Sequence, residues 1–234
     1  MNHLIIGAGA AGISAARTLL WEMPKDRVTI LSEDREVYSR CMLHRFISGE
    51  RDAESLNFIN DRLLNNSRVE WIRGKTVTRF DGASKTAYGG DEKLASGDTV
   101  IIATGANSVT PPIGDLKTAK NVYGLRHLPD ARAIAEKAAD AEKVVIVGAG
   151  LVGLDAAYAL IEGAEKRKRP VELTVIEMVP SVLAINLDPH AAGTYQRLFE
   201  KAGVTFHLGR KVVNTRSAPD GKGNLVLTGV EIDT

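Results

Sequence analysis

Apolar residues in this chain gather in short runs that are separated by turn-forming and charged residues. The clearest runs cover residues 3–6, 28–31, 99–102, 144–147 and 173–176. Each has the length of a strand, and such runs bounded by turn residues predict strands. Alanine-rich segments without proline follow the first and the fourth run and predict helices. The pattern therefore predicts an α/β fold.

One glycine-rich segment occurs twice in the chain. Residues 7–19 read GAGAAGISAARTL and residues 148–160 read GAGLVGLDAAYAL, so seven of thirteen positions are identical at an offset of 141 residues. Each copy follows an apolar run and begins a predicted helix. In this context G-x-G-x-x-G is typical of dinucleotide binding. The first glycine permits a tight turn, the second lets the backbone approach a pyrophosphate, and the third lets the helix pack against the strand.

Each copy is followed by a second apolar run that ends in an acidic residue. Glu33 lies 26 residues after Gly7, and Glu177 lies 29 residues after Gly148. A carboxylate at this place accepts a hydrogen bond from a ribose hydroxyl. Because Glu177 would repel a 2′-phosphate, and because Met178 rather than an arginine follows it, the second copy is predicted to prefer NADH over NADPH.

Composition and charge exclude several classes of protein. The chain has 30 Lys+Arg against 29 Asp+Glu, and it is 44% hydrophobic and 25% charged, as in ordinary globular proteins. The balanced charge predicts neither a nucleic-acid nor a membrane partner. The single cysteine, Cys41, excludes an intrachain disulfide and a multi-cysteine metal site. With no signal peptide at the N-terminus, we expect a cytoplasmic protein without a metal.

The two copies and two further segments resemble the FAD-dependent pyridine nucleotide–disulfide oxidoreductases. Residues 98–105, DTVIIATG, are similar to the T-x-x-x-x-A-T-G strand of that family, and residues 38–43, YSRCML, are similar to the Y-S-R-P-x-L segment of its rubredoxin reductases, nitrite reductase flavoproteins and NADH oxidases. The resemblance covers nearly the whole chain. It implies two Rossmann-like, three-layer (ββα/βαβ) domains, one for FAD over residues 1–108 and one for NAD(H) over residues 109–234.

The resemblance also implies which residues bind each cofactor. The FAD-binding residues would be Gly7, Gly9, Ala10, Ala11, Gly12, Glu33, Arg40, Arg45, Val77, Ala103, Thr104 and Gly105. The NADH-binding residues would be Gly148, Gly150, Leu151, Val152, Gly153, Asp155 and Glu177. Family members carry a glutamate over the nicotinamide at the position of Asp155. The shorter carboxylate reaches less far, which puts this role in doubt.

Cys41 is the candidate catalytic residue. Family members with a single redox cysteine have a glycine eight residues after it, as Gly49 is here, whereas the electron-transfer reductases have proline at the cysteine position. A short helix is predicted directly after Cys41, and its dipole together with Arg40, His44 and Arg45 would stabilise a thiolate. The oxidised form would be a sulfenic acid, a persulfide or a mixed disulfide. Alternatively, Cys41 fills the place of the proline without chemistry.

Three functions stay open at this point. The first is an FAD-dependent oxidoreductase that takes hydride from NADH and reduces a disulfide, persulfide or oxygen species through Cys41. The second is an electron-transfer reductase that serves rubredoxin, ferredoxin or a nitrite-reducing partner without cysteine chemistry. The third is a nucleotide-binding fragment without turnover. The resemblance implies that the last NAD-domain strand, the C-terminal return of the FAD domain and a C-terminal dimerisation domain are missing, so we expect an N-terminal fragment of a homodimeric parent.

Several local signals predict further elements. Asp188 and Pro189 predict the start of a helix that continues to Lys201. Another helix is expected over residues 130–139, and a hairpin is expected over residues 211–215 and 225–232. The basic run 166–169 is expected to be a solvated loop. Trp21 and Trp71 are expected to pack in the interior.

Overall fold

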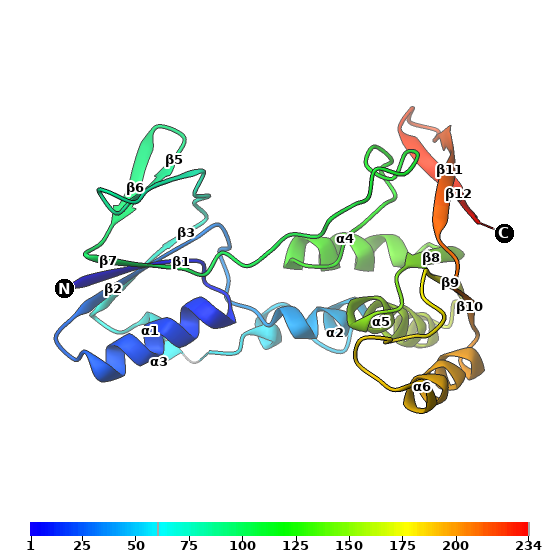
Figure 1. Cartoon of the computed structure of the whole chain (residues 1–234), viewed down its shortest axis with the longest axis horizontal. Helices are drawn as coiled ribbons and strands as arrows, with labels where there is room; N and C mark the ends of the chain where they lie inside the picture. The colour runs from blue at the N-terminus through cyan, green and yellow to red at the C-terminus, as the bar shows by residue number, and fades with distance from the viewer. Residues whose placement is uncertain (60, 234) are drawn as a thin grey trace. The chain divides into compact units, whose positions relative to one another are not determined.

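The computed structural model describes residues 1–59 and 61–233 and divides into two compact units (Figure 1). The first unit comprises residues 1–39 and 53–107, and the second comprises residues 40–52 and 108–234. One boundary falls at the predicted position near residue 108. The segment 40–52, however, packs with the second unit rather than with the predicted FAD domain. Its side chains Leu43 and Ile47 are buried there, only 2% and 3% exposed.

The first unit is built on a parallel sheet with the strand order β3-β2-β1-β7. Its strands are β1 (Asn2–Ile6), β2 (Arg27–Ser32), β3 (Val69–Arg73) and β7 (Thr99–Ile102). A second, antiparallel sheet has the order β4-β5-β6, with β4 (Arg79–Asp81), β5 (Thr86–Gly89) and β6 (Glu92–Ser96). The helices are α1 (Ala10–Glu22), α3 (Asp61–Leu64) and a 3-10 turn, Glu54–Leu56.

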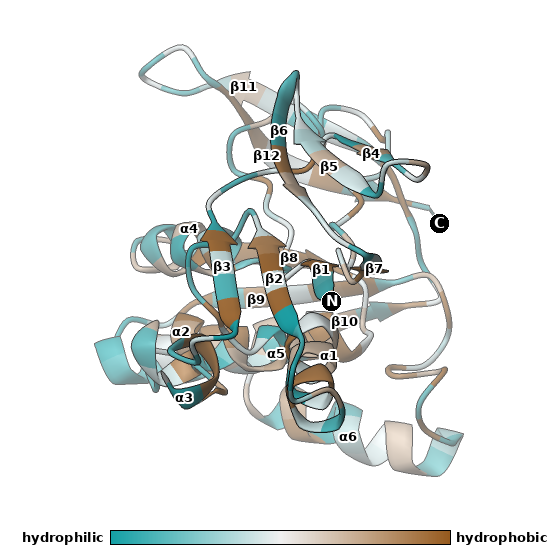
Figure 2. Ribbon diagram, turned by 90° about the vertical axis from the view of Figure 1, so that its left-hand side faces the viewer, coloured by the Kyte–Doolittle hydropathy of each residue, from teal (hydrophilic) through white to brown (hydrophobic). Residues whose placement is uncertain are grey.

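Side chains of the central strand β1 alternate between two cores and so create three layers. Ile5 points to the core that it shares with Ile13 and Ala16 of α1. Leu4 and Ile6 belong to the other core, which includes Phe80 and Leu94 of the antiparallel sheet. This alternation follows from the two-residue period of a strand. The first unit is therefore a ββα sandwich, with α1 and the antiparallel sheet on opposite faces of the parallel sheet (Figure 1). Within the parallel sheet, hydrophobic residues concentrate along β2 (Figure 2).

The second unit contains a parallel sheet with the order β10-β9-β8 and a long hairpin. Its strands are β8 (Lys143–Val147), β9 (Glu172–Glu177), β10 (Val204–Leu208), β11 (Val212–Pro219) and β12 (Leu225–Ile232). Its helices are a 3-10 turn, Arg40–Met42, followed by α2 (Leu43–Ile47), α4 (Leu128–Ala138), α5 (Leu151–Arg167) and α6 (Pro189–Lys201). The predicted α/β class is thus confirmed, and both glycine-rich segments connect a strand to a helix.

Most of the further predicted elements are present with shifted ends. Asp188 caps α6 by accepting hydrogen bonds from the backbone N–H groups of His190 and Ala191, at 2.9 and 3.1 Å. Helix α4 begins two residues before the predicted start, and Asp130 accepts a hydrogen bond from the backbone N–H of His127, at 2.8 Å. The first hairpin strand extends to Pro219. Local capping signals therefore located these elements well.

The strands that precede the two glycine-rich loops have different neighbours. Strand β1 pairs with β2 on one side and β7 on the other. In the part of the chain that the structure describes, β8 pairs with β9 alone. Val145 and Val147 of β8 are 44% and 52% exposed, whereas the corresponding residues of β1, Leu4 and Ile6, are buried against the antiparallel sheet.

The basic run 166–169 is exposed, as predicted, but only part of it is loop. Lys166 and Arg167 end α5, and their side chains donate hydrogen bonds to backbone carbonyls near the ends of two other helices. Lys166 Nζ donates to the carbonyl of Ser48 after α2, at 3.1 Å, and Arg167 donates to the carbonyl of Ala138 at the end of α4, at 3.1 Å. Carbonyls at helix C-termini lack intrahelical partners, so cations stabilise them.

The two tryptophans have different environments. Trp71 lies against the core of the first unit, and its Nε1 donates a hydrogen bond to Ser32 Oγ at 3.0 Å. Trp21 is 81% exposed, so the prediction that it packs in the interior is wrong. Across residues 1–59 and 61–233, every helix is too short or too polar to cross a membrane.

A buried histidine connects the start of β1 to its surroundings. His3 is 3% exposed; its Nδ1 lies 2.6 Å from Thr99 Oγ1, and its Nε2 lies 3.0 Å from Asp26 Oδ2. The N-terminal ammonium of Met1 donates to Asp26 Oδ1 at 2.9 Å. These two hydrogen bonds, that of the ammonium first, hold the pKa of Asp26 below its usual value. Asp26 therefore joins the N-terminus, β1 and β7 through His3.

Replacing Asp26 by asparagine is expected to lower the free energy of unfolding at pH 7 but not at low pH. A carboxyl whose pKa is depressed by folding contributes stability above its unfolded pKa of about 4, and this stability disappears as the pH falls through the folded value. Urea unfolding at pH 7 and near pH 2 measures the difference between wild type and variant. Asp91→Asn, in the exposed β5–β6 turn, is the control, and an equal loss at both pH values would contradict the role of the charge.

Candidate functional site

The first glycine-rich loop turns sharply between β1 and α1. Gly7 has φ +114°, and its N–H donates to the carbonyl of Leu31 at 2.8 Å. Gly9 caps α1 in an extended conformation. A Cβ added to Gly12 would overlap the carbonyl oxygen of Gly7, and one added to Gly7 would overlap that of Ala103. These positions therefore require glycine. The exposed residues Ala10 and Ala11 form the first turn of the helix, where N–H groups have no acceptor within the helix itself.

Other predicted FAD-binding residues lie at the same edge of the sheet. Ala103 follows β7, and its N–H donates to the carbonyl of Ile6 at 2.8 Å; Thr104 and Gly105 come next in the chain. Glu33 follows β2 and is exposed, with the Thr76 hydroxyl 3.5 Å from its Oε2. These groups meet because the carboxyl ends of parallel strands share one edge, where such sheets bind ligands. Val77, next to Thr76, packs its side chain against the core below.

The second glycine-rich loop repeats the backbone of the first. Gly148 has φ +110°, and Gly150 caps α5 with φ −77° and ψ −175°, against −75° and −176° at Gly9. A Cβ added to Gly153 would overlap the carbonyl oxygen of Gly148. Among the described residues, nothing lies within 4 Å of a Cβ added to Gly148 or Gly150. At the equivalent Gly7 the neighbour is Ala103, which follows β7, and β8 has no such neighbouring strand among the described residues.

Glu177 supports this loop directly. Its Oε2 accepts a hydrogen bond from the N–H of Ala149 at 2.7 Å, and its Oε1 accepts one from the N–H of Val179 at 3.0 Å. A carboxylate has about four acceptor positions, so both contacts leave capacity for a ribose hydroxyl. The sequence predicted only the ribose contact. The contact to the glycine-rich loop is an additional role, which a spacing motif does not contain.

Apolar side chains surround the second loop. Leu151 and Val152, in the first turn of α5, are 59% and 56% exposed, and Met178 after β9 is 71% exposed. The segment 178–187 returns to the loop, because the N–H of Leu183 donates to the carbonyl of Ala149 at 2.9 Å. Leu183 has a positive φ of +49°. The sequence did not predict that this residue contacts the glycine-rich loop. Exposed apolar residues around a polar cradle are typical of nucleotide-binding surfaces.

Asp155, one turn further along α5, contacts the segment 40–52. His44 Nδ1 lies 3.6 Å from Asp155 Oδ2, with side-chain exposures of 14% and 51%. Partial burial raises the pKa of Asp155, and the charge of His44 opposes this rise. The ring of Tyr158 meets the His44 ring edge-on, with centroids 6.3 Å apart. His44, expected to act on Cys41, is therefore a partner of Asp155.

Cys41 is exposed and lies in the 3-10 turn Arg40–Met42. The predicted helix follows it but is only five residues long, so its dipole is small. Arg45 forms an ion pair with Glu50. Both His44 and Arg45 thus have carboxylate partners within their own unit, and the structure does not support their predicted action on the Cys41 thiol. Arg40 begins the turn.

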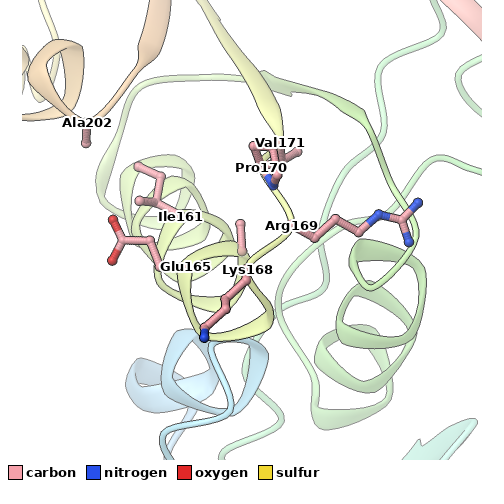
Figure 3. Close-up of a pocket in the computed structure, with 8 residues that line it drawn as sticks. Ile161, Glu165, Lys168, Arg169, Pro170, Val171 and Ala202 are labelled. Carbon is pink, nitrogen blue, oxygen red and sulfur yellow. The ribbon is translucent and has the colours of Figure 1, made fainter.

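A pocket of about 320 Å3 lies elsewhere in the second unit, where α5 ends, β9 begins and α6 ends (Figure 3). Its lining residues are Ile161, Ala164, Glu165, Lys168, Arg169, Pro170, Val171 and Ala202. It contains none of the predicted binding residues and faces the opposite edge of the sheet from the glycine-rich loop. Over residues 1–59 and 61–233, no group of three or more His, Cys, Asp or Glu side chains is placed to hold a metal ion.

Comparison with known protein families shows to which family the chain belongs. Residues 1–233 match the family described as pyridine nucleotide-disulphide oxidoreductase. The chain belongs to this family. The match extends over both units, and so the resemblance that the sequence motifs indicated is confirmed.

Individual members of the pyridine nucleotide-disulphide oxidoreductase family are similar to the chain over most of its length. An NADH oxidase of Methanocaldococcus jannaschii is 29% identical over 219 residues, which is 90% of this chain and 47% of the relative. The structure of a putidaredoxin reductase–putidaredoxin complex has a TM-score of 0.86 at 22% identity, covering 99% of this chain and 54% of that chain. An NAD-dependent persulfide reductase from A. fulgidus has a TM-score of 0.82 at 25% identity, with 100% and 46% covered. The chain thus spans about half the length of each of these three proteins.

Proposed function

We propose that the protein is an FAD-dependent oxidoreductase that takes hydride from NADH and reduces a disulfide, persulfide or oxygen species through Cys41. The observation that carries the proposal is the repeated loop, with φ of +114° at Gly7 and +110° at Gly148. Two cradles of one geometry in one chain suit one dinucleotide each. An NADH oxidase and an NAD-dependent persulfide reductase among the relatives support this activity. Both relatives are longer than this chain, which covers 47% and 46% of their lengths.

The first unit is proposed to bind FAD and the second NADH. When bound, FAD accepts hydride from the nicotinamide and passes electrons onward. The N–H groups at the start of α1 and α5 would hold the two pyrophosphates, and Glu33 and Glu177 would accept hydrogen bonds from the riboses. Preference for NADH rests on Glu177, whose carboxylate would repel a 2′-phosphate, and on Met178 beside it. Asp155 is proposed to face the nicotinamide ring.

Cys41 is proposed to react with the substrate because its side chain is accessible. Its Sγ would form a mixed disulfide as the sulfur–sulfur bond of the substrate breaks, and the leaving sulfur would take a proton. Two electrons from NADH would then return Cys41 to the thiol and release the second sulfur as a thiol. For a persulfide substrate the same balance releases hydrogen sulfide.

Electron transfer without cysteine chemistry is the second candidate function. Two observations favour it. Cys41 stands in a segment in which electron-transfer reductases carry proline, and His44 and Arg45 lie against Asp155 and Glu50 rather than Cys41. The acceptor would then be a small redox protein.

Replacing Cys41 by serine separates the two candidates. With FAD and NADH present, we expect reduction of coenzyme A disulfide and polysulfide to fall at least about 100-fold, because a hydroxyl is a poor substitute for a thiolate nucleophile. Reduction of ferricyanide should continue, since it takes electrons from the flavin. Met42→Leu, the adjacent position, serves as the matched control. Retention of disulfide and polysulfide reduction by Cys41→Ser would favour the electron-transfer function instead.

A further inference from the structure

We propose that His44 is a positioning residue for Asp155, and that this pair sets how strongly the nucleotide site prefers NADH over NAD+. The inference rests on the proposed function, because it takes Asp155 to face the nicotinamide ring. It adds a control of product release to that function.

The geometry of the pair comes from two different parts of the sequence. His44 Nδ1 lies 3.6 Å from Asp155 Oδ2, which is an ion-pair distance and too long for a strong hydrogen bond. The imidazole is mostly buried, at 14% exposure, whereas half of the carboxylate surface, 51%, is open to a ligand. Tyr158, one turn after Asp155, packs its ring edge-on to the imidazole. His44 is therefore held in place, and Asp155 remains accessible.

The helix that carries His44 is attached firmly to its own unit. Leu43 and Ile47, on either side of His44 in α2, are 2% and 3% exposed. Lys166 on α5 donates a hydrogen bond to the carbonyl of Ser48 at the end of the same helix, at 3.1 Å. Two separate anchors thus fix α2 against α5, so the position of His44 relative to Asp155 is set by packing.

Two other charged residues, one on α2 and one on α4, have partners of their own. Arg45, adjacent to His44, forms its ion pair with Glu50. Asp130 of α4 accepts hydrogen bonds from the backbone N–H groups of Arg126 and His127, at 2.9 and 2.8 Å. From α2, it is the imidazole of His44 that lies against the Asp155 carboxylate.

The effect of this pair on nucleotide affinity depends on the redox state of the nicotinamide ring. The ring of NAD+ carries a positive charge, and the ring of NADH is neutral. An uncompensated carboxylate next to the ring would bind NAD+ more tightly and slow the release of product. A protonated imidazole beside the carboxylate offsets that attraction. Two charges about 4 Å apart in water interact by an amount that corresponds to a roughly three- to fivefold change in affinity.

Binding measurements on the full chain test the proposal. NADH affinity is measured by the change in nicotinamide fluorescence at pH 6.0, and NAD+ affinity by competition. His44→Gln is expected to raise the affinity for NAD+ relative to NADH about three- to fivefold. Asp155→Asn should change this ratio in the opposite direction, because it leaves the imidazolium alone. The double variant should return it close to wild type.

Opposite effects on the ratio distinguish a charge effect from a structural one. Loss of packing would weaken both nucleotides together and leave the ratio unchanged. His190→Gln, an exposed histidine on α6, is the matched control and should leave both affinities unaltered. If both single variants move the ratio in the same direction, or leave it within error of wild type, the inference is overturned while the proposed function stands. If the wild-type chain binds neither nucleotide, the proposed function fails and the inference fails with it.

Discussion

Replacing Gly153 by alanine is expected to abolish NADH binding by the second unit. A Cβ at this position would overlap the carbonyl oxygen of Gly148, which is backbone and does not move aside as a flexible side chain would. The loop and the start of α5 would have to separate, which displaces the N–H groups that we expect to hold the pyrophosphate. Loss of two charge-assisted hydrogen bonds of about 1.5–3 kcal/mol each corresponds to a loss of affinity on the order of 100-fold or more.

The same unit provides a matched control for this substitution. Gly193 lies inside α6, and the nearest atom to an added Cβ is a guanidinium nitrogen of Arg197, at 3.4 Å. Alanine at this position should keep NADH binding intact and stabilise the helix by up to about 1 kcal/mol. Fluorescence titration gives the affinities, and circular dichroism gives the folded fraction of each variant. A folded Gly153→Ala protein that binds NADH within a factor of about three of wild type would show that the close contact has no functional role.

Replacing Glu177 by alanine is expected to weaken NADH binding at least about tenfold. The substitution removes the proposed ribose acceptor and also the acceptors for the N–H groups of Ala149 and Val179. A charge-assisted hydrogen bond contributes about 1.5–3 kcal/mol, so losing several of them exceeds a tenfold effect. Adding Met178→Arg should then reverse the preference toward NADPH, because the exposed position 178 would present a guanidinium to the 2′-phosphate.

Measured dissociation constants for NADH and NADPH decide this prediction. Glu172→Ala, at the other end of β9, is the control, since Glu172 pairs with Lys143 on the surface and should leave both constants unaltered. Unchanged NADH affinity in Glu177→Ala would exclude the ribose contact. A Glu177→Ala, Met178→Arg double variant that still prefers NADH would place the source of cofactor preference elsewhere.

The sequence predicted those features that depend on neighbouring residues. The strand–turn–helix at each glycine-rich loop, the cap at Asp188 and the hairpin ending at Ile232 all follow from short patterns with a local physical cause. The family relationship followed as well, because its motifs combine several such patterns over nearly the whole chain.

Contacts between distant segments were not predictable in the same way. The residues after Cys41 form the expected helix, but burial of Leu43 and Ile47 attaches it to the second unit. Consequently His44 contacts Asp155 rather than Cys41. Lys166, which was expected in a solvated loop, donates a hydrogen bond at the end of α2. Trp21 shows the same limit, since hydrophobicity alone does not determine which face of α1 is covered.

The most direct test of the account is an anaerobic titration of the chain with NADH after reconstitution with FAD. Two working dinucleotide sites predict that the protein takes up FAD and that NADH then removes the visible absorbance of the bound flavin. The Gly153→Ala variant should take up FAD and keep this absorbance. A wild-type protein that stays colourless with added FAD, or that keeps an oxidised flavin in excess NADH, would contradict the proposed hydride transfer in this chain.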